Sequence, residues 1–462
     1  MGLEELQSRI EGKVTTRSDS GYEDLRRGII WNQLTPARYP RLIVQAASER
    51  DVVEAVRFAR AQGMKIAVRG GGHSWVGFSL RDESLLIDLG LLKQLSIDPG
   101  ARLAKIQPAV TGRELNRQSS AHGLAFPIGH CSSVPLSGYL LNGGLGWNSN
   151  MWGPACFSVE AANVVTADGS LVVANKEQNA DLLWAVRGAG PGFFAVVTQY
   201  LLKLHPAPRA ITTSTYYYPL RHIEEVGAWA ASIAGQLPSE VELTLFIAQA
   251  PPDLAEQCRS TNGFVCILSA TAFLDTESEA TAALGLLESC PVAHDSLKRA
   301  LNQPNSFEAL LDLGGMLWPE RHRYLADTLW SDSPPAELLA IAREHFLRAP
   351  SPKSLAVCVI STGTRDNVAA PPDAAFSMTG NTLLLCYGIW EQPDDDAANA
   401  AWHRETIAAL DPFAVGHYVG ESDIVAKPER AEMSFARANW RRLQSLRRKY
   451  DPDDLFHGHF SA

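Results

Sequence analysis

The chain has 462 residues, of which 46% are hydrophobic and 20% charged, and its formal net charge is −10. This composition is typical of a globular protein of two or three domains, and the negative charge argues against nucleic acid or an anionic membrane surface as the main partner. No apolar run reaches the ~18 residues of a membrane-spanning helix. The acidic start is unlike a signal peptide, and seven scattered cysteines lack a C-x-x-C pair. We therefore expect a cytoplasmic protein without disulfides.

The first 120 residues alternate strand and helix patterns. A helix is expected from residue 4, followed by irregular chain to residue 35. Strands are predicted at 40–45, 65–68, 85–89 and 103–110. Ser48 opens an amphipathic helix after the first strand, and Thr111 caps a second helix after the last. This order predicts an α+β fold for the N-terminal part.

A three-glycine turn follows the strand at 65–68. Its sequence is Arg-Gly-Gly-Gly-His-Ser at 69–74. Glycines let backbone N–H groups approach a ligand closely, and such a turn is typical of phosphate binding. The pattern is not the G-x-G-x-x-G dinucleotide fingerprint. Taken alone, it is also compatible with a tight turn that ends in a surface histidine, His73.

Residues 126–147 form a glycine-rich segment that also carries apolar residues throughout. A flexible linker would be polar, so we expect an ordered loop with a short helix around a ligand, with Cys131 in its middle. A hairpin turning at Asp168 and Gly169, a helix at 181–187 and a strand at 195–204 follow. The prolines at 206 and 208 mark a boundary.

Residues 209–411 have a different pattern, which predicts one antiparallel sheet covered by helices. Strand-like runs are found at 211–218, 241–249, 263–273, 354–362 and 381–390. Helical runs are found at 221–235, 276–288, 295–313, 335–347 and 397–410. The region contains no glycine-rich turn and no metal-ligand spacing, so it resembles a cap that faces a substrate. Trp318, Tyr387 and Trp390 are its candidate stacking residues.

Four motifs together resemble the FAD-linked oxidoreductases of the vanillyl-alcohol oxidase superfamily, with a PCMH-type FAD-binding domain, and within them the berberine-bridge-enzyme-like branch. They are Arg-Gly-Gly-Gly-His-Ser at 69–74, Gly-His-Cys-Ser-Ser-Val at 129–134, Leu-Leu-Trp-Ala-Val-Arg-Gly at 182–188 and Tyr-Asp-Pro-Asp-Asp-Leu-Phe at 450–456. The resemblance covers nearly the whole chain.

The resemblance implies a FAD domain built from residues 1–208 (its PCMH-type core at about 36–208) and the tail at 412–462, with a substrate-binding cap at 209–411 between them. It implies FAD bonded twice, through His73 to the 8α position and through Cys131 to C6 of the flavin. The other cofactor-binding residues that it implies are Arg69, Gly70, Gly71, Gly72, Ser74, Gly77, Ser132, Ser133, Val134, Ser137, Gly138, Gly143, Gly144 and Phe456.

The resemblance also assigns catalytic candidates, each with a plain structural alternative. Tyr418 matches the tyrosine of the family's Tyr-x-Asn motif and is the expected catalytic residue, although it could be a packing aromatic; Gly420 replaces the family's Asn. As a general base, Tyr418 would need a cationic or hydrogen-bonding partner. Glu391 is a possible acid–base carboxylate, but an exposed turn residue is the better interpretation. His459 stands where the family tail often has Asn.

The covalent residues have alternatives too. Cys131 could be an inert core residue, the usual state of a free cysteine. A metal site made from His73, His130 and Cys131 would lack the usual ligand spacing.

Leu136 stands where many oxidases of this branch have Val, next to the space where oxygen meets the reduced flavin. A bulkier residue there implies a slow oxidase or a dehydrogenase with another acceptor. The expected activity is oxidation of a carbon bearing oxygen or nitrogen in a sugar, aromatic alcohol or other secondary metabolite, by hydride transfer to flavin N5. A flavin-assisted cyclase or isomerase, and a non-catalytic metabolite-binding protein, remain alternatives. The oligomeric state is expected to be a monomer or a homodimer.

Overall fold

A four-stranded sheet forms the N-terminal end of the molecule in the computed structural model, which describes residues 2–363 and 373–459. Its strand order is β1-β2-β4-β3, with the last three strands parallel. The elements are α1 (Leu3–Arg9), β1 (Lys13–Thr16), α2 (Tyr22–Gly28), β2 (Leu42–Gln45), α3 (Glu49–Gln62), β3 (Ile66–Arg69) and β4 (Leu85–Asp88). The expectation of irregular chain before residue 36 is wrong, because β1 pairs with β2 and α2 follows it.

Helix α3 shows how the sequence places these elements. The Ser48 side chain accepts a hydrogen bond from the Asp51 N–H at its start, and Gly63 ends it with a φ of 60°. A side chain at that φ would be strained, so glycine is the favoured residue. The apolar face of α3, including Val52 and Val56, is buried against the sheet. The parallel strand β3 therefore ends at a fixed point, where the glycine turn begins.

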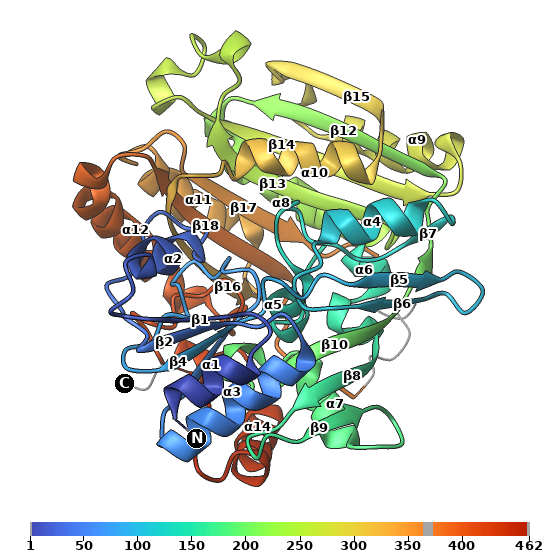
Figure 1. Cartoon of the computed structure of the whole chain (residues 1–462). Coiled ribbons are helices and arrows are strands. Elements are labelled where there is room, and N and C mark those ends of the chain that lie inside the picture. The colour runs from blue at the N-terminus through green and yellow to red at the C-terminus, as the bar shows by residue number, and fades with distance from the viewer. Residues whose placement is uncertain (1, 364–372, 460–462) are drawn as a thin grey trace.

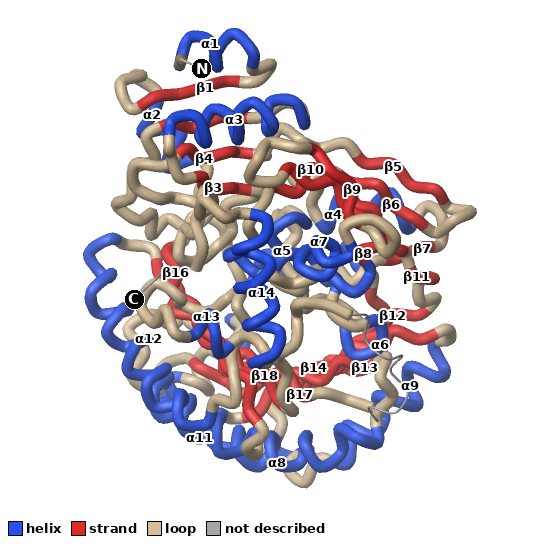
Figure 2. The backbone as a smooth tube through the Cα atoms, turned by 90° about the horizontal axis from the view of Figure 1, so that it is seen from below, coloured by secondary structure: helices blue, strands red, loops and turns tan. Residues whose placement is uncertain are grey.

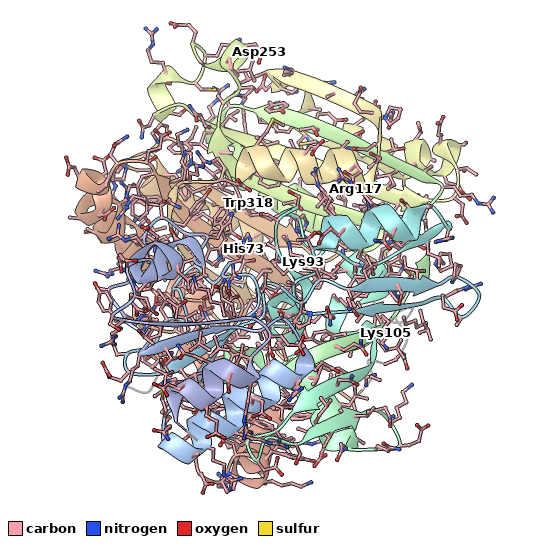
Figure 3. All side chains as sticks on the ribbon, viewed as in Figure 1. His73, Lys93, Lys105, Arg117, Asp253 and Trp318 are labelled. Atoms are coloured by element: carbon pink, nitrogen blue, oxygen red, sulfur yellow. The ribbon has the colours of Figure 1, made fainter. Side chains whose placement is uncertain are left out.

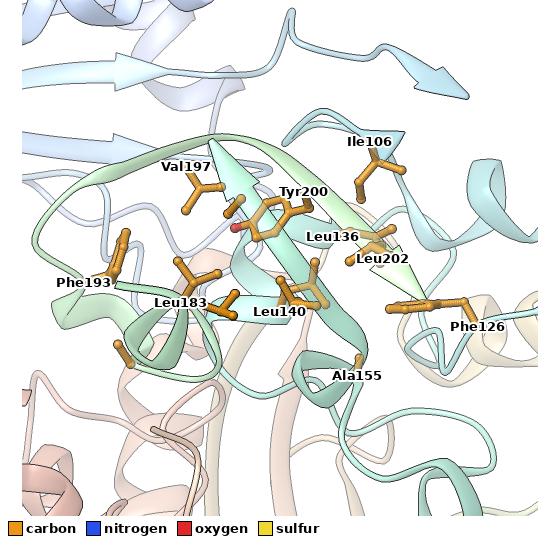
Figure 4. Close-up of a cluster of buried hydrophobic side chains, with 14 of the residues drawn as sticks. Ile106, Phe126, Leu136, Leu140, Ala155, Leu183, Phe193, Val197, Tyr200 and Leu202 are labelled. Atoms are coloured by element: carbon orange, nitrogen blue, oxygen red, sulfur yellow. The ribbon is translucent and has the colours of Figure 1, made fainter. Parts of the chain in front are cut away.

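A five-stranded antiparallel sheet lies beside the first, in the order β5-β6-β10-β8-β9. Its strands are β5 (Leu95–Asp98), β6 (Leu103–Ile106), β8 (Val159–Val165), β9 (Leu171–Ala174) and β10 (Val196–Lys203), and a short pair is formed by β7 (Leu124–Ala125) and β11 (His205–Pro206). The helices of this part are α4 (Gly112–Ser120), α5 (Leu136–Leu141), α6 (Ser149–Trp152) and α7 (Ala180–Val186). Leu136, Leu140 and Tyr200 lie in the buried cluster between α5 and this sheet (Figure 4).

Residues 210–390 build a seven-stranded antiparallel sheet, here called the cap sheet. Its order is β15-β12-β14-β13-β17-β18-β16. The strands are β12 (Ala210–Tyr218), β13 (Val241–Gln249), β14 (Phe264–Leu274), β15 (Lys298–Asn305), β16 (Arg323–Ser331), β17 (Leu355–Ile360) and β18 (Thr382–Trp390). Figure 1 shows this sheet in the upper half of the molecule and the two N-terminal sheets in the lower half.

Four helices cover one face of the cap sheet. They are α8 (Ile223–Ile233), α9 (Glu277–Gly285), α11 (Pro335–Phe346) and α12 (Asp396–Leu410), and in Figure 2 they follow the outer rim. Alternate residues of β13, such as Leu243 and Leu245, pack in the core under these helices. The predicted helix at 295–313 is wrong in its first half, which forms β15 before α10 (Phe307–Leu317) begins. The second face of the sheet is turned toward the N-terminal half.

The C-terminal tail returns to the first sheet. It carries α13 (Arg430–Met433) and α14 (Arg437–Tyr450). The N–H of Ile66 in β3 donates to the Leu455 carbonyl at 2.8 Å, and Ile66 forms a parallel bridge with Phe456. The buried Asp451 carboxylate accepts hydrogen bonds from the Leu455 and Phe456 N–H groups. Chain ends far apart in sequence therefore meet at the strand that leads into the glycine turn. Across the described residues, none of the helices combines the length and apolar character that crossing a membrane requires.

Candidate active site

A cavity of about 550 Å³ separates the cap sheet from the N-terminal half. Its lining includes the glycine turn (residues 69–74), the loop that carries Cys131 (residues 129–147, here the Cys131 loop) and the face of the cap sheet that α8, α9, α11 and α12 leave uncovered. Helix α10 and part of the C-terminal tail (residues 418–422) line it as well. His73 from the turn and Trp318 from the end of α10 lie near the middle of the molecule in Figure 3. Most of the residues that the sequence assigned to a cofactor line this cavity: Arg69, Gly70, Gly71, Gly72, His73, Ser74, Cys131, Val134, Ser137, Gly138 and Phe456. The catalytic candidate Tyr418 lines it as well.

The glycine turn is packed so closely that side chains would not fit. A Cβ on Gly70 would overlap the Ser137 hydroxyl, one on Gly71 would overlap the Pro135 ring, and one on Gly72 would overlap the Ile29 carbonyl. Gly72 also has a φ of 73°, which side chains rarely adopt. The turn therefore presents bare backbone to the cavity.

The Arg69 side chain holds this turn in place rather than reaching into the cavity. Its guanidinium donates to the Asp88 carboxylate at 2.8 Å, to the Ile29 carbonyl at 3.0 Å and to the Gly71 carbonyl at 3.1 Å. Asp88 is buried, and it also accepts the Gly90 N–H. Backbone N–H groups, not this guanidinium, are thus the groups available to a phosphate.

Replacing Asp88 by Asn is expected to lower the free energy of unfolding by about 3–5 kcal/mol, because it leaves the largely buried Arg69 charge without its partner. A urea unfolding midpoint measures this loss. The control is Asp453→Asn, which removes an exposed pair with Arg60 at 3.3 Å and should change stability by about 1 kcal/mol or less. Equal stability of the two variants would contradict a structural role for the Arg69–Asp88 pair.

His73 is held as a neutral imidazole at the edge of the cavity. Its ring stacks on Trp31 with a centroid separation of 5.1 Å, and it makes a hydrogen bond to the Ser133 backbone. Burial lowers the pKa of His73 to about 4, and the nearby Arg69 charge acts in the same direction. A neutral ring nitrogen keeps its lone pair, so His73 is able to act as a nucleophile at neutral pH.

Cys131 is the one cysteine of the described residues that is not fully buried. It lines the cavity, whereas the other six pack in the interior. Burial and, to a smaller extent, the nearby Glu421 carboxylate raise the pKa of its thiol to about 12. Cys131 is therefore a thiol at neutral pH, and a reaction at its sulfur needs a group that accepts the thiol proton.

The second half of the Cys131 loop holds Tyr418. The N–H groups of Gly144 and Leu145 hydrogen-bond the phenol oxygen of Tyr418. Gly144 has a φ of 78°, and a Cβ there would lie 2.8 Å from the Tyr139 ring. Gly420 is equally constrained, since its Cβ would lie 3.0 Å from Cζ of Tyr418. Both glycines thus allow close packing around one phenol.

A buried carboxylate, Glu421, lies close to Tyr418 in the cavity lining. It was not assigned a role from the sequence. Its Oε2 accepts a hydrogen bond from the Tyr387 hydroxyl, and a second comes from the Trp75 side chain. Burial raises the pKa of Glu421, although these two donors oppose the rise. The signal in the sequence that could have identified Glu421 is its position directly after the Tyr-Val-Gly segment at 418–420. Its hydrogen-bond partners are distant in the chain, since Tyr387 belongs to β18 and Trp75 follows the glycine turn.

The environment of Tyr418 opposes the expected general-base role of its phenol. Burial and the Glu421 carboxylate both raise the pKa of Tyr418, and the two backbone donors only partly offset this. The charged group that faces the phenol is an anion rather than the cation that the sequence-based hypothesis required. Tyr418 therefore stays protonated at neutral pH, and Glu421 is the more acidic of the two groups.

Several sequence-based assignments lie elsewhere. The Leu136 side chain is 1% exposed and packs in the core at the start of α5, outside the cavity lining; its oxygen-access role stays a prediction. Trp390 is also buried, and its indole donates to Asp396 at 2.7 Å. Glu391 is on the surface and pairs with His322 and Lys353.

Other assigned residues support the cavity without lining it. The residues in this group are Gly77, Ser132, Ser133, Gly143 and Gly144; Ser133 contacts His73 through its backbone, and Gly144 contacts Tyr418. His459 packs against Gly192 and Trp440, outside this cavity. No group of three or more metal-binding side chains suited to a metal ion is found among the residues that the structure describes.

The cavity wall suits a large, polar, planar ligand such as FAD. Four indole N–H groups of the described lining residues, those of Trp31, Trp147, Trp318 and Trp330, are buried without a hydrogen-bond partner. Buried donors without partners are costly, so a ligand with several acceptors is expected to satisfy them. The glycine turn offers backbone N–H groups for a pyrophosphate at one side, and His73 and Cys131 lie on the same cavity wall.

Comparisons with known proteins support FAD binding by this chain. Residues 40–175, which include the glycine turn and the Cys131 loop, match a family model described as FAD binding domain. The FAD-linked oxidoreductase nodO of Hypoxylon pulicicidum is 29% identical over 449 residues, 96% of each chain. Two solved structures share the fold: 6-hydroxy-D-nicotine oxidase from Arthrobacter nicotinovorans (TM-score 0.82, 21% identity, 98% of both chains) and berberine bridge enzyme from Eschscholzia californica (TM-score 0.81, 20% identity, 98% of this chain and 97% of the other).

Proposed function

We propose that the chain is a berberine-bridge-enzyme-like FAD-linked oxidoreductase, that it carries FAD on His73 and Cys131, and that it oxidises a carbon bearing a hydroxyl or an amine. The observation that carries the proposal is the buried Glu421 carboxylate, which faces the cavity beside Tyr387, Tyr418 and Cys131. The enzyme then takes a small-molecule substrate and a second electron acceptor, oxygen or another oxidant.

FAD supplies the hydride acceptor when it is bound; the protein supplies binding, orientation and proton transfer. In the proposed arrangement, His73 and Cys131 hold the flavin at its 8α and C6 positions. The backbone N–H groups of the glycine turn bind the pyrophosphate. The aromatic side chains of Trp75 and Tyr387 exclude water from Glu421, since both line the cavity and both donate to its carboxylate.

Glu421 is proposed as the general base. Loss of a hydride from a carbon is easier when the attached hydroxyl or ammonium group loses its proton. Glu421 and Tyr418 are both buried, but a carboxyl group starts from a pKa near 4.5 and a phenol from one near 10. Glu421 is therefore the more acidic of the two groups, and in its ionised form it accepts the substrate proton at a carboxylate oxygen. Tyr418 remains a neutral hydrogen-bond donor that orients the substrate.

The mass of the acid-denatured protein tests the attachment. The wild type is expected to keep the added mass of one FAD, and both Cys131→Ala and His73→Ala are expected to keep it through the remaining bond. The double variant should release its flavin. Peptide mapping of the wild type then locates the two bonds, and Cys156→Ala, which removes a fully buried thiol, is the matched control. A wild-type protein at its bare polypeptide mass, with free flavin in the supernatant, would refute covalent attachment.

A further inference from the structure

The uncovered face of the cap sheet is divided into a polar half and an apolar half. The polar half is formed by two rows of side chains that cross β12, β14 and β13. Thr215, Ser269 and Thr244 lie opposite one another in the first row. In the second row, Thr213, Thr271 and Glu242 lie opposite one another. All six side chains line the cavity, and we call them the hydroxyl grid.

The next row along the same strands is apolar. Tyr217, Ile267 and Phe246 continue it across β12, β14 and β13, and Val357 and Leu385 extend it onto β17 and β18. Because side chains of a strand alternate between its two faces, polar residues at every second position give one polar surface. The apolar row lies between this surface and Tyr387, which contacts Glu421.

Three hydroxyls of the grid are available to a ligand. In the second row, Thr213 and Thr271 are paired at 3.1 Å, and Thr213 also accepts from Asn305. In contrast, no side-chain hydrogen bond within the described part of the chain uses Thr215, Thr244 or Ser269. Each hydroxyl both donates and accepts, so the three together suit neighbouring hydroxyl groups of a ligand.

Glu242 adds an acceptor at one corner of the grid. Its Oε1 accepts the Asn148 N–H, and its Oε2 lies 3.9 Å from Nε2 of His130. The side chain is 12% exposed, so it is largely removed from water but open to the cavity. A carboxylate beside free hydroxyls favours a ligand that brings its own O–H donors.

Thr244 of the grid lies far from Tyr387, which donates a hydrogen bond to Glu421. Thr244 is two strands and four residues from Tyr387, through the pairings with Val359 and Leu383. With about 4.8 Å between strands and 3.3 Å per residue, the backbone positions of the two residues are roughly 16 Å apart. A group bound at Thr244 is therefore a part of the substrate distant from Tyr387.

We infer that the hydroxyl grid binds the polyhydroxylated, sugar-like part of an amphiphilic substrate whose apolar part lies over the row from Tyr217 to Leu385. The inference rests on the proposed function only in taking the ligand that lies against the cap sheet to be the substrate. Among the substrates that would fit a cavity with both aromatic and polar walls, the inference favours glycoside-like molecules. The hydroxyls at 215, 244 and 269 then determine specificity, while Glu421 acts on the other end of the molecule.

Isothermal titration calorimetry of the flavin-loaded protein tests this with defined probes. The probes are phenyl β-D-glucopyranoside and phenyl β-D-galactopyranoside, and the control ligand is phenyl 2,3,4,6-tetra-O-methyl-β-D-glucopyranoside, which keeps the ring but has no O–H donors. The wild type is expected to bind at least one glycoside, and to bind the methylated compound at least tenfold more weakly. Absence of binding by both glycosides, or equal affinity for the methylated control, would overturn the inference.

A pair of variants separates the grid from the rest of the cavity. Thr215→Val with Thr244→Val keeps side-chain shape and removes two hydroxyls, so affinity for the glycoside is expected to fall about tenfold or more. Thr212→Val removes a hydroxyl from the opposite face of β12 and should leave affinity unchanged. Unchanged affinity in the double variant would refute the grid. These binding measurements need no turnover. Failure of a flavin-loaded protein to bind the glycosides as expected would therefore refute only the hydroxyl grid. Absence of the added flavin mass would refute only the covalent attachment.

Discussion

Glu421→Gln is expected to lower the rate constant of flavin reduction by about 10²- to 10⁴-fold, the usual contribution of a positioned general base. The amide keeps the size of the side chain and its contacts with Tyr387 and Trp75, but it cannot accept a proton. Anaerobic stopped-flow absorbance measures the effect, with the member of an alcohol and amine panel that reduces the wild-type flavin fastest. Glu391→Gln is the matched control because Glu391 is exposed and lies outside the cavity lining.

The pH dependence of the flavin reduction rate tests the same assignment. Burial raises the pKa of Glu421 above its usual value near 4.5. The base works only when ionised, so the rate of flavin reduction should fall as the pH drops through this raised pKa, and should be constant above it until another group titrates. Glu421→Gln should lose that acidic limb, whereas Glu421→Asp should keep one. A variant Glu421→Gln that retains both the rate and the acidic limb would refute the base assignment.

The groups that face Glu421 come from several elements. Tyr387 belongs to β18, Trp75 follows the glycine turn, and Cys131 and His130 belong to the Cys131 loop. His130 is the cation-forming group among them, and it acts to lower the pKa of Glu421. The midpoint of the acidic limb is therefore expected to rise in His130→Ala, which removes that influence.

Local sequence patterns predicted the segments that hold the flavin better than those that hold the substrate. The glycine turn follows a buried strand and precedes a His. Thr111 caps α4 as expected, and Glu114 completes a capping box. The missed strand β15 carries mainly polar residues and has no alternating burial, because it pairs on only one side at the edge of the cap sheet. The residues of β15 are therefore mostly polar, and they do not show the alternation of polar and apolar residues that identifies a strand.

The burial of Leu136 beside the cavity has a different physical cause. Its neighbours Val134 and Ser137 line the cavity, so the position in the chain is close to the site. Leu136 is the first residue of α5, however, and a helical turn sends consecutive side chains in directions about 100° apart. The sequence located the segment, but the direction of the side chain depended on where the helix begins.

The Glu421 cluster was not predictable from local pattern at all. Its carboxylate is held by groups that lie 34 and 346 positions away in the chain, Tyr387 and Trp75. They meet only because the tail returns beneath the cap sheet. Interpretation of a single sequence detects the residue type but not this convergence, and a Glu in a short irregular segment is most simply a surface residue.

With the proposed double attachment of FAD, Gly314→Ala is expected to prevent the bond between Cys131 and the flavin while leaving the bond to His73. Helix α10 packs on the Cys131 loop through Gly314, where a Cβ would overlap the backbone carbonyl of His130. The helix or the loop must then shift, and Cys131 is the next residue along the loop. Alanine improves helix propensity by about 1 kcal/mol, but this gain cannot relieve an overlap with backbone atoms that have no alternative rotamer.

Gly315→Ala is the matched control for this prediction, because it makes the same change one residue later in α10, where a Cβ would meet nothing within 4 Å. It should keep both flavin bonds and be slightly more stable than the wild type. Peptide mapping of each variant for flavin on the His73 and Cys131 peptides measures the outcome. If Gly314→Ala formed both bonds as completely as Gly315→Ala, the contact between α10 and the Cys131 loop would not control the position of the thiol. Loss of both bonds in Gly314→Ala alone would instead mean that α10 supports the whole cavity, because His73 lies on a separate segment that the substitution does not touch.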